Sequence, residues 1–295
     1  MKAALLPDRS VIKVSGPDAR GFLNGLLTSD ITRVSPVQAA FAALLTPQGK
    51  IIADTLVTEA PEAEGGGFML DVPRALAGDL VTKLTFYKLR AKVQIENLSE
   101  SLAVMALWDG ASQAGDGLDY QDPRLPALGR RIILPPGEAQ TAATVRGAEM
   151  VDIAAYEAHR ISLGVPRGGF DFTYGDAFPH EADMDQLGGV DFGKGCYVGQ
   201  EVVSRMEHRG TARTRIVPVT TDGEAPEPGL PVMAGEKRIG TTGSSHGNHA
   251  LAMLRLDRLA DALASGQTIE ADGVALRPRQ PSWAKFPVPN ATLPT

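Results

Sequence analysis

Apolar positions in the first third of the chain switch between the spacing of strands and the spacing of helices. Residues 10–14 (SVIKV) predict a short strand. The apolar residues of the following segment fall on one helical face, at i, i+3, i+4, i+7 and i+8: Ala19, Phe22, Leu23, Leu26 and Leu27. Ser15 or Gly16 is expected to cap this helix, with Pro17 in its first turn.

The next hundred residues continue with predicted antiparallel strands and one helix. Residues 39–60 predict a hairpin around a turn at Pro47, Gln48 and Gly49, and residues 67–72, 92–98 and 102–108 predict further strands. Residues 73–90 predict a helix with leucines spaced by four: Leu76, Leu80 and Leu84. Interspersed helices and antiparallel strands indicate an α+β layer structure and not a Rossmann alternation.

The pattern of apolar residues changes towards the C-terminus. Residues 109–148 predict only short strands, and residues 152–165 predict a helix ended by Gly164 and Pro166. After residue 211, short strand patterns separated by Gly and Pro indicate a small β-barrel or sandwich, with one short helix within 256–266. We therefore predict two regions, 1–211 and 212–295, which agrees with about 150 residues per domain.

Composition limits the class of protein and of partner. A hydrophobic fraction of 43% with 22% charged residues is typical of a folded globular chain. The net charge of −6 gives no overall basic footprint, so we expect no direct binding of nucleic acid. No apolar run approaches the roughly 18 residues of a spanning helix, so we expect no membrane association.

The single cysteine, Cys196, excludes an intramolecular disulfide and indicates a reducing compartment. The opening residues MKAALLPDRS hold too short an apolar stretch for the core of a signal peptide. We therefore expect a cytoplasmic protein.

Cys196 lies in the stretch DFGKGCYVGQEVVSR, residues 191–205. A helix is predicted to start near Gly199 and end at Gly210, so the thiol would precede the positive end of that helix. Lys194 would lie close by, and both features favour a thiolate. Gly195 and Gly199 would allow a ligand or another chain to approach. The alternative is that Cys196 is a small buried hydrophobe, which is the commoner fate of a lone cysteine.

Other chemical patterns are weaker. His246 and His249 lie in a turn without a third ligand, and the carboxylates of 115–119 and 183–185 lack the spacing of a calcium loop. No metal site is predicted. A lone cysteine also does not hold an iron–sulfur cluster by itself, because such clusters take about four ligands.

The motif closely resembles the signature of the YgfZ family, folate-binding proteins linked to iron–sulfur cluster assembly and repair. The matching residues are Lys194, Gly195, Cys196, Tyr197, Gly199, Gln200, Glu201 and Arg205. Residues 11–31, 44–57 and 160–166 are similar both to this family and to the related T-protein (aminomethyltransferase) of glycine cleavage. The resemblance implies an α+β, T-protein-like cloverleaf of three lobes with mostly antiparallel sheets. Its first two lobes would be interleaved, its last lobe a β-barrel, and its centre a folate-sized hole.

The chain departs from aminomethyltransferases at two carboxylates. Where those enzymes carry two adjacent acidic residues after the hairpin turn, this chain has Ala53-Asp54. Where they carry a pterin-holding glutamate, it has Ser162. A carboxylate is the natural acceptor for the N–H groups of a pterin ring, so both losses argue against aminomethyl transfer.

The resemblance thus implies a tetrahydrofolate-binding factor that serves iron–sulfur enzymes, tRNA-modifying enzymes among them, or cluster-assembly proteins. Cys196 would be the reactive or cluster-contacting thiolate, and Lys194 would stabilise it or bind an anionic tail. Gln200 and Arg205 would orient the loop, unless Arg205 only pairs with Glu201, four residues earlier on the same predicted helix. Asn24, Thr28, Asp54 and Ser162 are the candidate folate-binding residues, and the first three would line the hole. Two alternatives stay open: a folate-dependent aminomethyl or methyl transferase, and a non-catalytic binding module with a structural cysteine.

Overall fold

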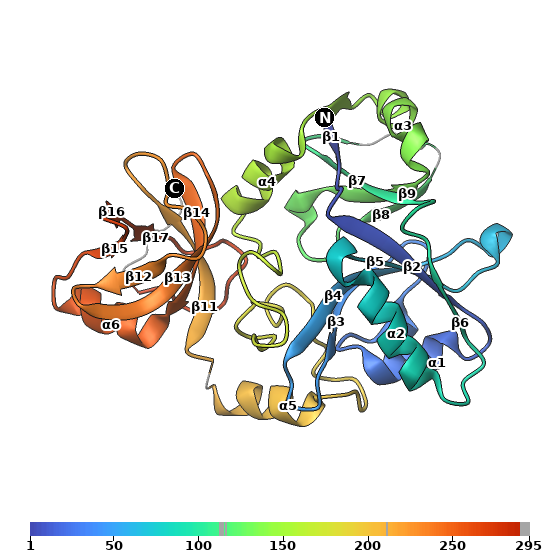
Figure 1. The fold of residues 1–295 in the computed structure, drawn as a ribbon, viewed down its shortest axis with the longest axis horizontal. Coiled ribbons are helices and arrows are strands. Elements are labelled where there is room, and N and C mark those ends of the chain that lie inside the picture. Colours follow the sequence, from blue (N-terminus) through green and yellow to red (C-terminus); the bar gives the residue numbers. More distant parts are fainter. Residues whose placement is uncertain (112–114, 116, 211, 290–295) are drawn as a thin grey trace. The chain divides into compact units, whose positions relative to one another are not determined.

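The computed structural model describes residues 1–111, 115, 117–210 and 212–289 (Figure 1). The chain forms two compact units. Unit 1 comprises Met1–Gln48, Ile52–Tyr156 and Leu187–Gln200, and unit 2 comprises Gly49–Ile51, Glu157–Gln186 and Glu201–Thr295. The α+β class is confirmed. The predicted boundary between 1–211 and 212–295 falls beside residue 211, which lies outside the described residues, and it stays a prediction.

The first sheet of unit 1 carries the predicted hairpin and both predicted helices. Its strand order is β3-β4-β5-β2-β6. The pairs β4–β5, β5–β2 and β2–β6 are antiparallel. The strands are β2 (Arg9–Ser15), β3 (Ala40–Leu45), β4 (Ile51–Glu59), β5 (Phe68–Pro73) and β6 (Gln94–Asn97). Helices α1 (Ala19–Leu26) and α2 (Ala77–Lys88) bury their apolar faces in the same core (Figure 1). The predicted cap of α1 is wrong, because the helix starts later and Asp18 is its N-cap.

The second sheet of unit 1 has the order β10-β1-β7-β9-β8. Its strands are β1 (Lys2–Leu5), β7 (Ala103–Trp108), β8 (Leu118–Gln121), β9 (Arg130–Leu134) and β10 (Glu149–Met150). The sequence pattern missed β1 and the helix α3 (Ala139–Val145). Helix α3 buries only alanines, which give a weak apolar signal: Ala139, Ala142 and Ala143.

A buried ionic network joins the two sheets of unit 1. Asp71 on β5 accepts from Arg131 on β9 at 3.0 Å and from Arg9 on β2 at 2.6 Å. Arg131 also donates to Asp122 at 3.2 Å, and Arg124 binds the same carboxylate through two nitrogens. Burial alone would raise the pKa of Asp122, but the guanidinium of Arg124 and then that of Arg131 outweigh it and lower the pKa to about 2. The carboxylate therefore stays charged in the core.

Unit 2 contains a seven-stranded, antiparallel, nearly closed β-barrel with the order β16-β15-β12-β13-β14-β11-β17. The strands are β11 (Thr214–Thr220), β12 (Pro231–Ala234), β13 (Lys237–His246), β14 (His249–Arg255), β15 (Ile269–Ala271), β16 (Val274–Ala275) and β17 (Arg277–Pro278). Helix α6 (Leu256–Ala264) closes its core. The predicted barrel and the mostly antiparallel pairing are confirmed.

Two further helices connect the units along the chain. Helix α4 (Ile153–Ser162) starts in unit 1 and continues into unit 2. In α5 (Gln200–Arg209), only the first residue belongs to unit 1 and the rest of the helix to unit 2. Short 3-10 turns complete the described structure at Ile31–Arg33, Glu62–Glu64, Arg74–Leu76, Pro126–Leu128 and Pro136–Glu138. Within the described ranges, every helix is too short or too polar to cross a lipid bilayer.

Candidate functional site

The cysteine motif forms an irregular loop, residues 187–199, that leads directly into α5. Gly199 has a left-handed φ of +83°, which glycine adopts at little cost, and the helix starts at the next residue. Gly210 follows the helix with a φ of +56° and donates its N–H to the carbonyl of Glu207 at 3.1 Å. The predicted start and stop of this helix are confirmed.

Cys196 is exposed at the surface of this loop. Beside it, a Cβ atom placed on Gly195 would meet nothing within 4 Å. The packing interpretation of the lone cysteine is therefore wrong, because the thiol fills no core. A thiol on an open loop, next to a residue without a side chain, can be reached by a partner protein or a bulky ligand.

Lys194 points inward from the same loop and is only 9% exposed. Its ammonium donates to the carbonyls of Asn24 and Leu27, each at 2.7 Å, and of Ser29 at 2.8 Å. These carbonyls lie at the C-terminal end of α1 and just after it, where a helix leaves acceptors unsatisfied and favours a cation. An ammonium has three N–H donors, and all three are used here. The predicted action of Lys194 on the thiolate or on an anionic tail stays a prediction.

Burial lowers the pKa of Lys194 to about 8, although the carboxylates of Asp30 and Asp191 act in the opposite direction. Tyr197 is also buried, with its ring centroid 5.2 Å from the Lys194 nitrogen. Burial, with Asp191, raises the pKa of Tyr197 to about 12, so the phenol stays neutral. Its hydroxyl has no hydrogen-bond partner among the described residues. Two inward side chains thus hold the loop on either side of an outward thiol.

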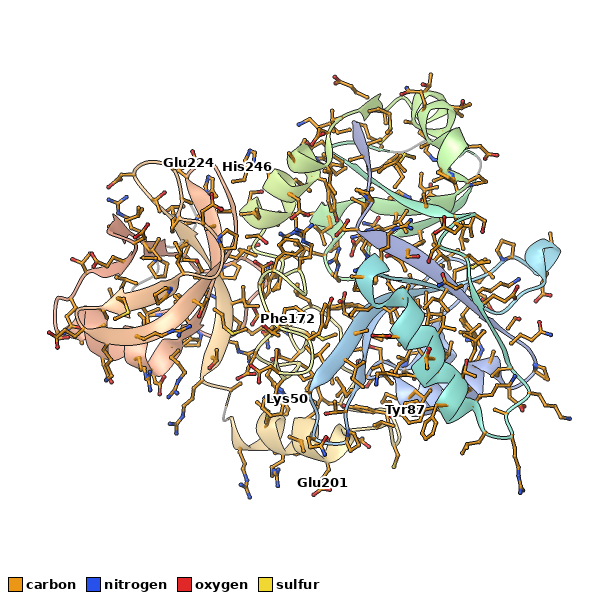
Figure 2. The ribbon with its side chains drawn as sticks, viewed as in Figure 1. Lys50, Tyr87, Phe172, Glu201, Glu224 and His246 are labelled. Atoms are coloured by element: carbon orange, nitrogen blue, oxygen red, sulfur yellow. The ribbon has the colours of Figure 1, made fainter. Side chains whose placement is uncertain are left out.

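The remaining motif residues lie at the start of α5. The backbone N–H of Gln200 donates to the carbonyl of Tyr197 at 3.3 Å. Glu201 and Arg205 are both exposed, and Figure 2 shows Glu201 pointing away from the helix. The expected ion pair between them is wrong, since the described part of the chain contains no contact of that kind between the two. The orienting roles of Gln200 and Arg205 stay predictions.

Asn24 and Thr28 serve the fold around the loop. The Asn24 side chain accepts from the N–H of Ile31 at 3.0 Å. The fully buried hydroxyl of Thr28 donates to the carbonyl of Gly189 at 2.5 Å and accepts from the N–H of Ala43 at 2.8 Å. Both side chains therefore connect the end of α1 to neighbouring segments. A role for them in ligand binding stays a prediction.

The other two residues predicted to bind folate lie in different units. Asp54 is buried in unit 1, with its carboxylate 3.6 Å from the guanidinium of Arg9. Ser162 is exposed in unit 2 and donates its hydroxyl to the carbonyl of His159 at 2.7 Å. The Asp54 carboxylate is thus partly neutralised by a neighbouring cation, which reduces its value as an acceptor for a pterin.

A polar recess of about 320 Å³ lies against the upstream half of the loop. Arg33 is its main cation, 3.1 Å from Asp30 and 3.5 Å from Asp191. Phe192, 39% exposed, supplies an apolar wall. Sequence reasoning missed this recess, because its two sides are separated by about 150 residues along the chain and meet only through the fold.

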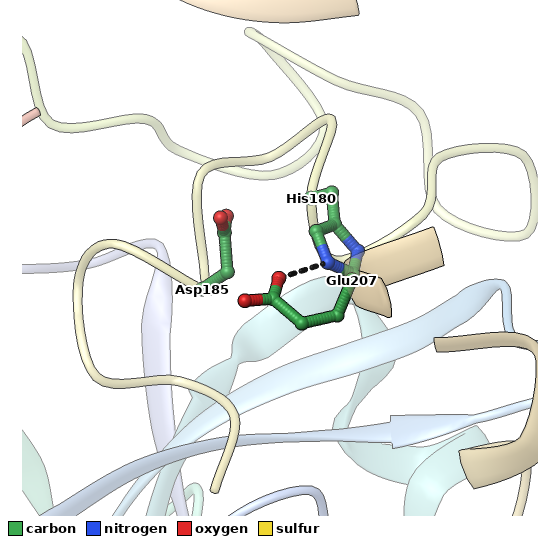
Figure 3. Close-up of side chains that lie close together, drawn as sticks. All are labelled: His180, Asp185 and Glu207. Atoms are coloured by element: carbon green, nitrogen blue, oxygen red, sulfur yellow. Dashed lines mark hydrogen bonds and ion pairs between the residues drawn. The ribbon is translucent and has the colours of Figure 1, made fainter. Parts of the chain in front are cut away.

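A second cluster of titratable groups lies in unit 2, where His180, Asp185 and Glu207 place potential ligand atoms within 4.8 Å of one another. Figure 3 shows the His180 ring facing Glu207, and their Nε2 and Oε2 atoms are 3.0 Å apart. Arg215, however, binds both oxygens of Asp185, at 2.6 and 3.0 Å. A guanidinium on that carboxylate repels a metal cation, so we interpret the cluster as structural: an ion pair between Arg215 and Asp185, and a hydrogen bond that fastens Glu207 of α5 to His180.

Comparison with known proteins identifies relatives for both ends of the chain. Residues 8–114 match the GCVT N-terminal domain, and residues 213–286 match the CAF17 C-terminal beta-barrel domain. The iron–sulfur cluster assembly factor IBA57 homolog, mitochondrial, of Mycosarcoma maydis is 36% identical over 74% of this chain and 57% of its own length. The human mitochondrial assembly factor IBA57 is 32% identical over 94% of this chain and 84% of its own.

The fold also matches a solved structure. The crystal structure of glycine cleavage system aminomethyltransferase T from Bartonella henselae superposes with a TM-score of 0.75 at 19% identity, covering 96% of this chain and 86% of that one. The predicted T-protein-like fold is therefore confirmed.

The same relatives correct the predicted location. Those from Mycosarcoma maydis, Coccidioides immitis and Homo sapiens are mitochondrial proteins, so the cytoplasmic prediction is wrong. A single free cysteine indicates the redox state of a compartment and does not say which reducing compartment it is.

Proposed function

Because the chain belongs to the CAF17/IBA57 family of iron–sulfur cluster assembly factors, we propose that it assists the assembly or repair of iron–sulfur clusters through the Cys196 thiol. The observation that carries this proposal is the exposure of Cys196 on a loop held from beneath by Lys194 and Tyr197. We propose further that, within this family, the chain is close to the YgfZ proteins, because residues 194–205 resemble their signature.

The number of thiols limits how the protein handles its cargo. A cluster takes about four ligands, and this chain has one cysteine. Cys196 would therefore supply one ligand, and a partner would supply the others. The cluster is shared between two molecules or passes from one to the other, and is not stored in this chain. Iron–sulfur enzymes and cluster-assembly proteins are the partners of this proposal.

Anaerobic incubation of the purified protein with ferric iron, sulfide and glutathione tests this step, because glutathione provides the missing thiolates. We expect wild type to elute from gel filtration with the visible absorbance of a cluster, and Cys196→Ser to elute without it. Val145→Ala, a change at another exposed position, is the control and should behave as wild type. Equal absorbance with Cys196→Ser would contradict the assignment of the thiol.

We propose in addition that the T-protein-like region binds a tetrahydrofolate. The match of residues 8–114 to the GCVT N-terminal domain supports this. The pairing of Asp54 with Arg9 and the serine at position 162 argue for weak binding. Calorimetric titration with tetrahydrofolate is the test. We expect Asp54→Asn to weaken binding further, and the absence of heat with wild type would remove folate from the account without touching Cys196.

Folate-dependent aminomethyl or methyl transfer is the second candidate function, favoured by the same domain match. The substitution of one residue of the acidic pair by Ala53 argues against it, since the reaction loses a carboxylate. Turnover of an aminomethyl or methyl donor by the purified protein with tetrahydrofolate would favour the transferase. Inactivity with these donors agrees with the assembly function.

A further inference from the structure

The C-terminal end of α2 carries an unusual surface, which we call the α2-end surface and define by two apolar and four basic residues. Phe86 and Leu89 are 76% and 87% exposed. The basic residues are Lys83, Lys88, Arg90 and Lys92. All six belong to unit 1. Protruding apolar side chains surrounded by charges of one sign are typical of an interaction site.

The α2-end surface is basic, whereas the chain as a whole carries a net negative charge. Lysine and arginine make up 29 of 295 residues, about one in ten, and the chain has a net charge of −6. Residues 83–92 (KLTFYKLRAK) hold four basic residues and no acidic one. Among the residues that the structure describes, none of the four forms an ion pair. The positive charge is therefore available to a partner.

The backbone holds Leu89 outward at a cost. Leu89 ends α2 with φ +45° and ψ −105°, a positive-φ conformation outside the left-handed helical region that leucine rarely adopts. The turn around it is fixed: Ala91 donates to the carbonyl of Lys88 at 2.8 Å, and the N–H of Lys92 donates to the Asp18 carboxylate at 2.7 Å. Val93 anchors the segment in the core. A strained, rigid turn that presents an apolar side chain to solvent indicates a binding role.

Phe86 is held in place by a neighbouring ring. Its ring packs edge-on against Tyr87, with ring centroids 5.9 Å apart. Figure 2 shows Tyr87 on α2, where it is half-buried against the core of the first sheet. Because Tyr87 supports the ring of Phe86, little freedom is lost when a partner covers it.

A cleft of about 520 Å³ lies at the turn that carries Leu89, lined by Lys88, Ala91 and Lys92 on either side of Leu89 in the chain and by Gly16 and Pro17 among others. A concave cleft at the turn of a protruding apolar residue fits a protein, which presents both protrusions and hollows. A bilayer surface would leave the cleft unfilled. The lysines in its wall select for acidic side chains.

We propose that the α2-end surface docks an acidic protein segment, with Leu89 and Phe86 as apolar anchors and the four basic residues as the rim that steers it. This inference does not depend on the role of Cys196. It predicts an affinity that falls with salt, because exposed charge pairs are screened within about 8 Å at physiological ionic strength.

Photo-crosslinking tests the proposal. A benzoylphenylalanine placed at position 86 of the full chain, in cells of its host, is expected to form an adduct with one protein through a peptide rich in aspartate and glutamate. The same probe at Val37, which is 91% exposed elsewhere in unit 1, is the control and should not form this adduct. The double change Lys83→Glu with Arg90→Glu should reduce the adduct about tenfold or more, and replacing acidic residues of the captured peptide by lysine should restore it.

Leu89→Gly separates docking from folding. Glycine accepts a positive φ at little cost, so the thermal midpoint should hold or rise while the adduct decreases. The proposal is overturned if no adduct forms at position 86, if the adduct is unaffected by charge reversal, or if the adduct is to RNA. It is also overturned if the protein sediments with phosphatidylglycerol vesicles through these basic residues and shows no charge-dependent binding to a protein.

Discussion

The fastening of the cysteine loop by Lys194 leads to a quantitative prediction for Lys194→Met. Methionine keeps the length of the side chain but removes all three donors, which leaves the carbonyls of Asn24, Leu27 and Ser29 without them. A hydrogen bond to a charged group contributes about 1.5–3 kcal/mol, so three bonds contribute about 5–9 kcal/mol if they add.

Burial of the ammonium opposes this gain. A pKa lowered from 10.5 to about 8 corresponds to about 3 kcal/mol against the charged form. The difference leaves about 2–6 kcal/mol, and because neighbouring bonds are not additive we expect a loss near the lower end, about 3 kcal/mol. For a unit of this size, such a loss lowers the melting temperature by about 6–12 °C.

The two tryptophans make the assay specific. Trp108 is buried in unit 1 against Tyr156, and Trp283 lies in unit 2, where its indole donates to the carbonyl of Leu163 at 2.8 Å. In a Trp283→Phe background, urea unfolding followed by fluorescence therefore reports unit 1 alone. Lys83→Met, at an exposed lysine of α2 in the same unit, is the matched control and should change the free energy of unfolding by less than about 0.5 kcal/mol. If Lys194→Met shifts unit 1 by no more than the control does, the loop is held by other contacts and the reasoning fails.

Three further predictions concern acid stability, the motif glycines and the thiol. Asp122→Asn should cost about 2 kcal/mol at neutral pH, from the fall of the pKa to about 2. The stabilising contribution of Asp122 is complete above pH 4 and is lost as the pH falls towards 2, because the unfolded state then binds the extra proton; urea unfolding of unit 1 at pH 7 and pH 3 should show a smaller difference between variant and wild type at pH 3. Gly195→Ala should leave the melting temperature unchanged but reduce cellular function. Gly199→Ala should lower the melting temperature, because it forces a side chain into a left-handed backbone. Equal melting temperatures for the two variants would contradict the requirement for glycine in the turn before α5. Iodoacetamide should modify Cys196 stoichiometrically in the native protein near neutral pH, as mass spectrometry can show, and protection until denaturant is added would contradict the exposed loop.

Periodic patterns with strong apolar residues predicted the fold well. The face of α1, the leucines of α2, the hairpin and the strand-rich C-terminal region all followed from spacing. What failed was short or weakly apolar. β1 has only four residues, and α3 buries alanines, so neither stands out from a loop in a single sequence.

The site was predictable only in part, for a different physical reason. The residues that form the loop around Cys196 are close in sequence: two glycines, a lysine and the start of a helix. Their pattern therefore located the loop, and the family resemblance suggested its function. Partners far apart in sequence could not be found. Lys194 binds carbonyls about 165–170 residues away, and backbone carbonyls leave no trace in a sequence. From its place beside the cysteine, Lys194 is predicted to act on the thiolate, and the fastening role that the structure adds was not foreseeable.

The measurement closest to the central claim is rescue in the living cell. The gene is deleted in its host, a [4Fe–4S]-dependent dehydratase or tRNA-modifying enzyme is assayed, and wild type, Cys196→Ser and Val145→Ala are returned at equal soluble expression. We predict that wild type and Val145→Ala restore the activity and that Cys196→Ser does not. Full rescue by Cys196→Ser would contradict a working thiol, and unimpaired cluster enzymes in the deletion strain would contradict the assembly function itself.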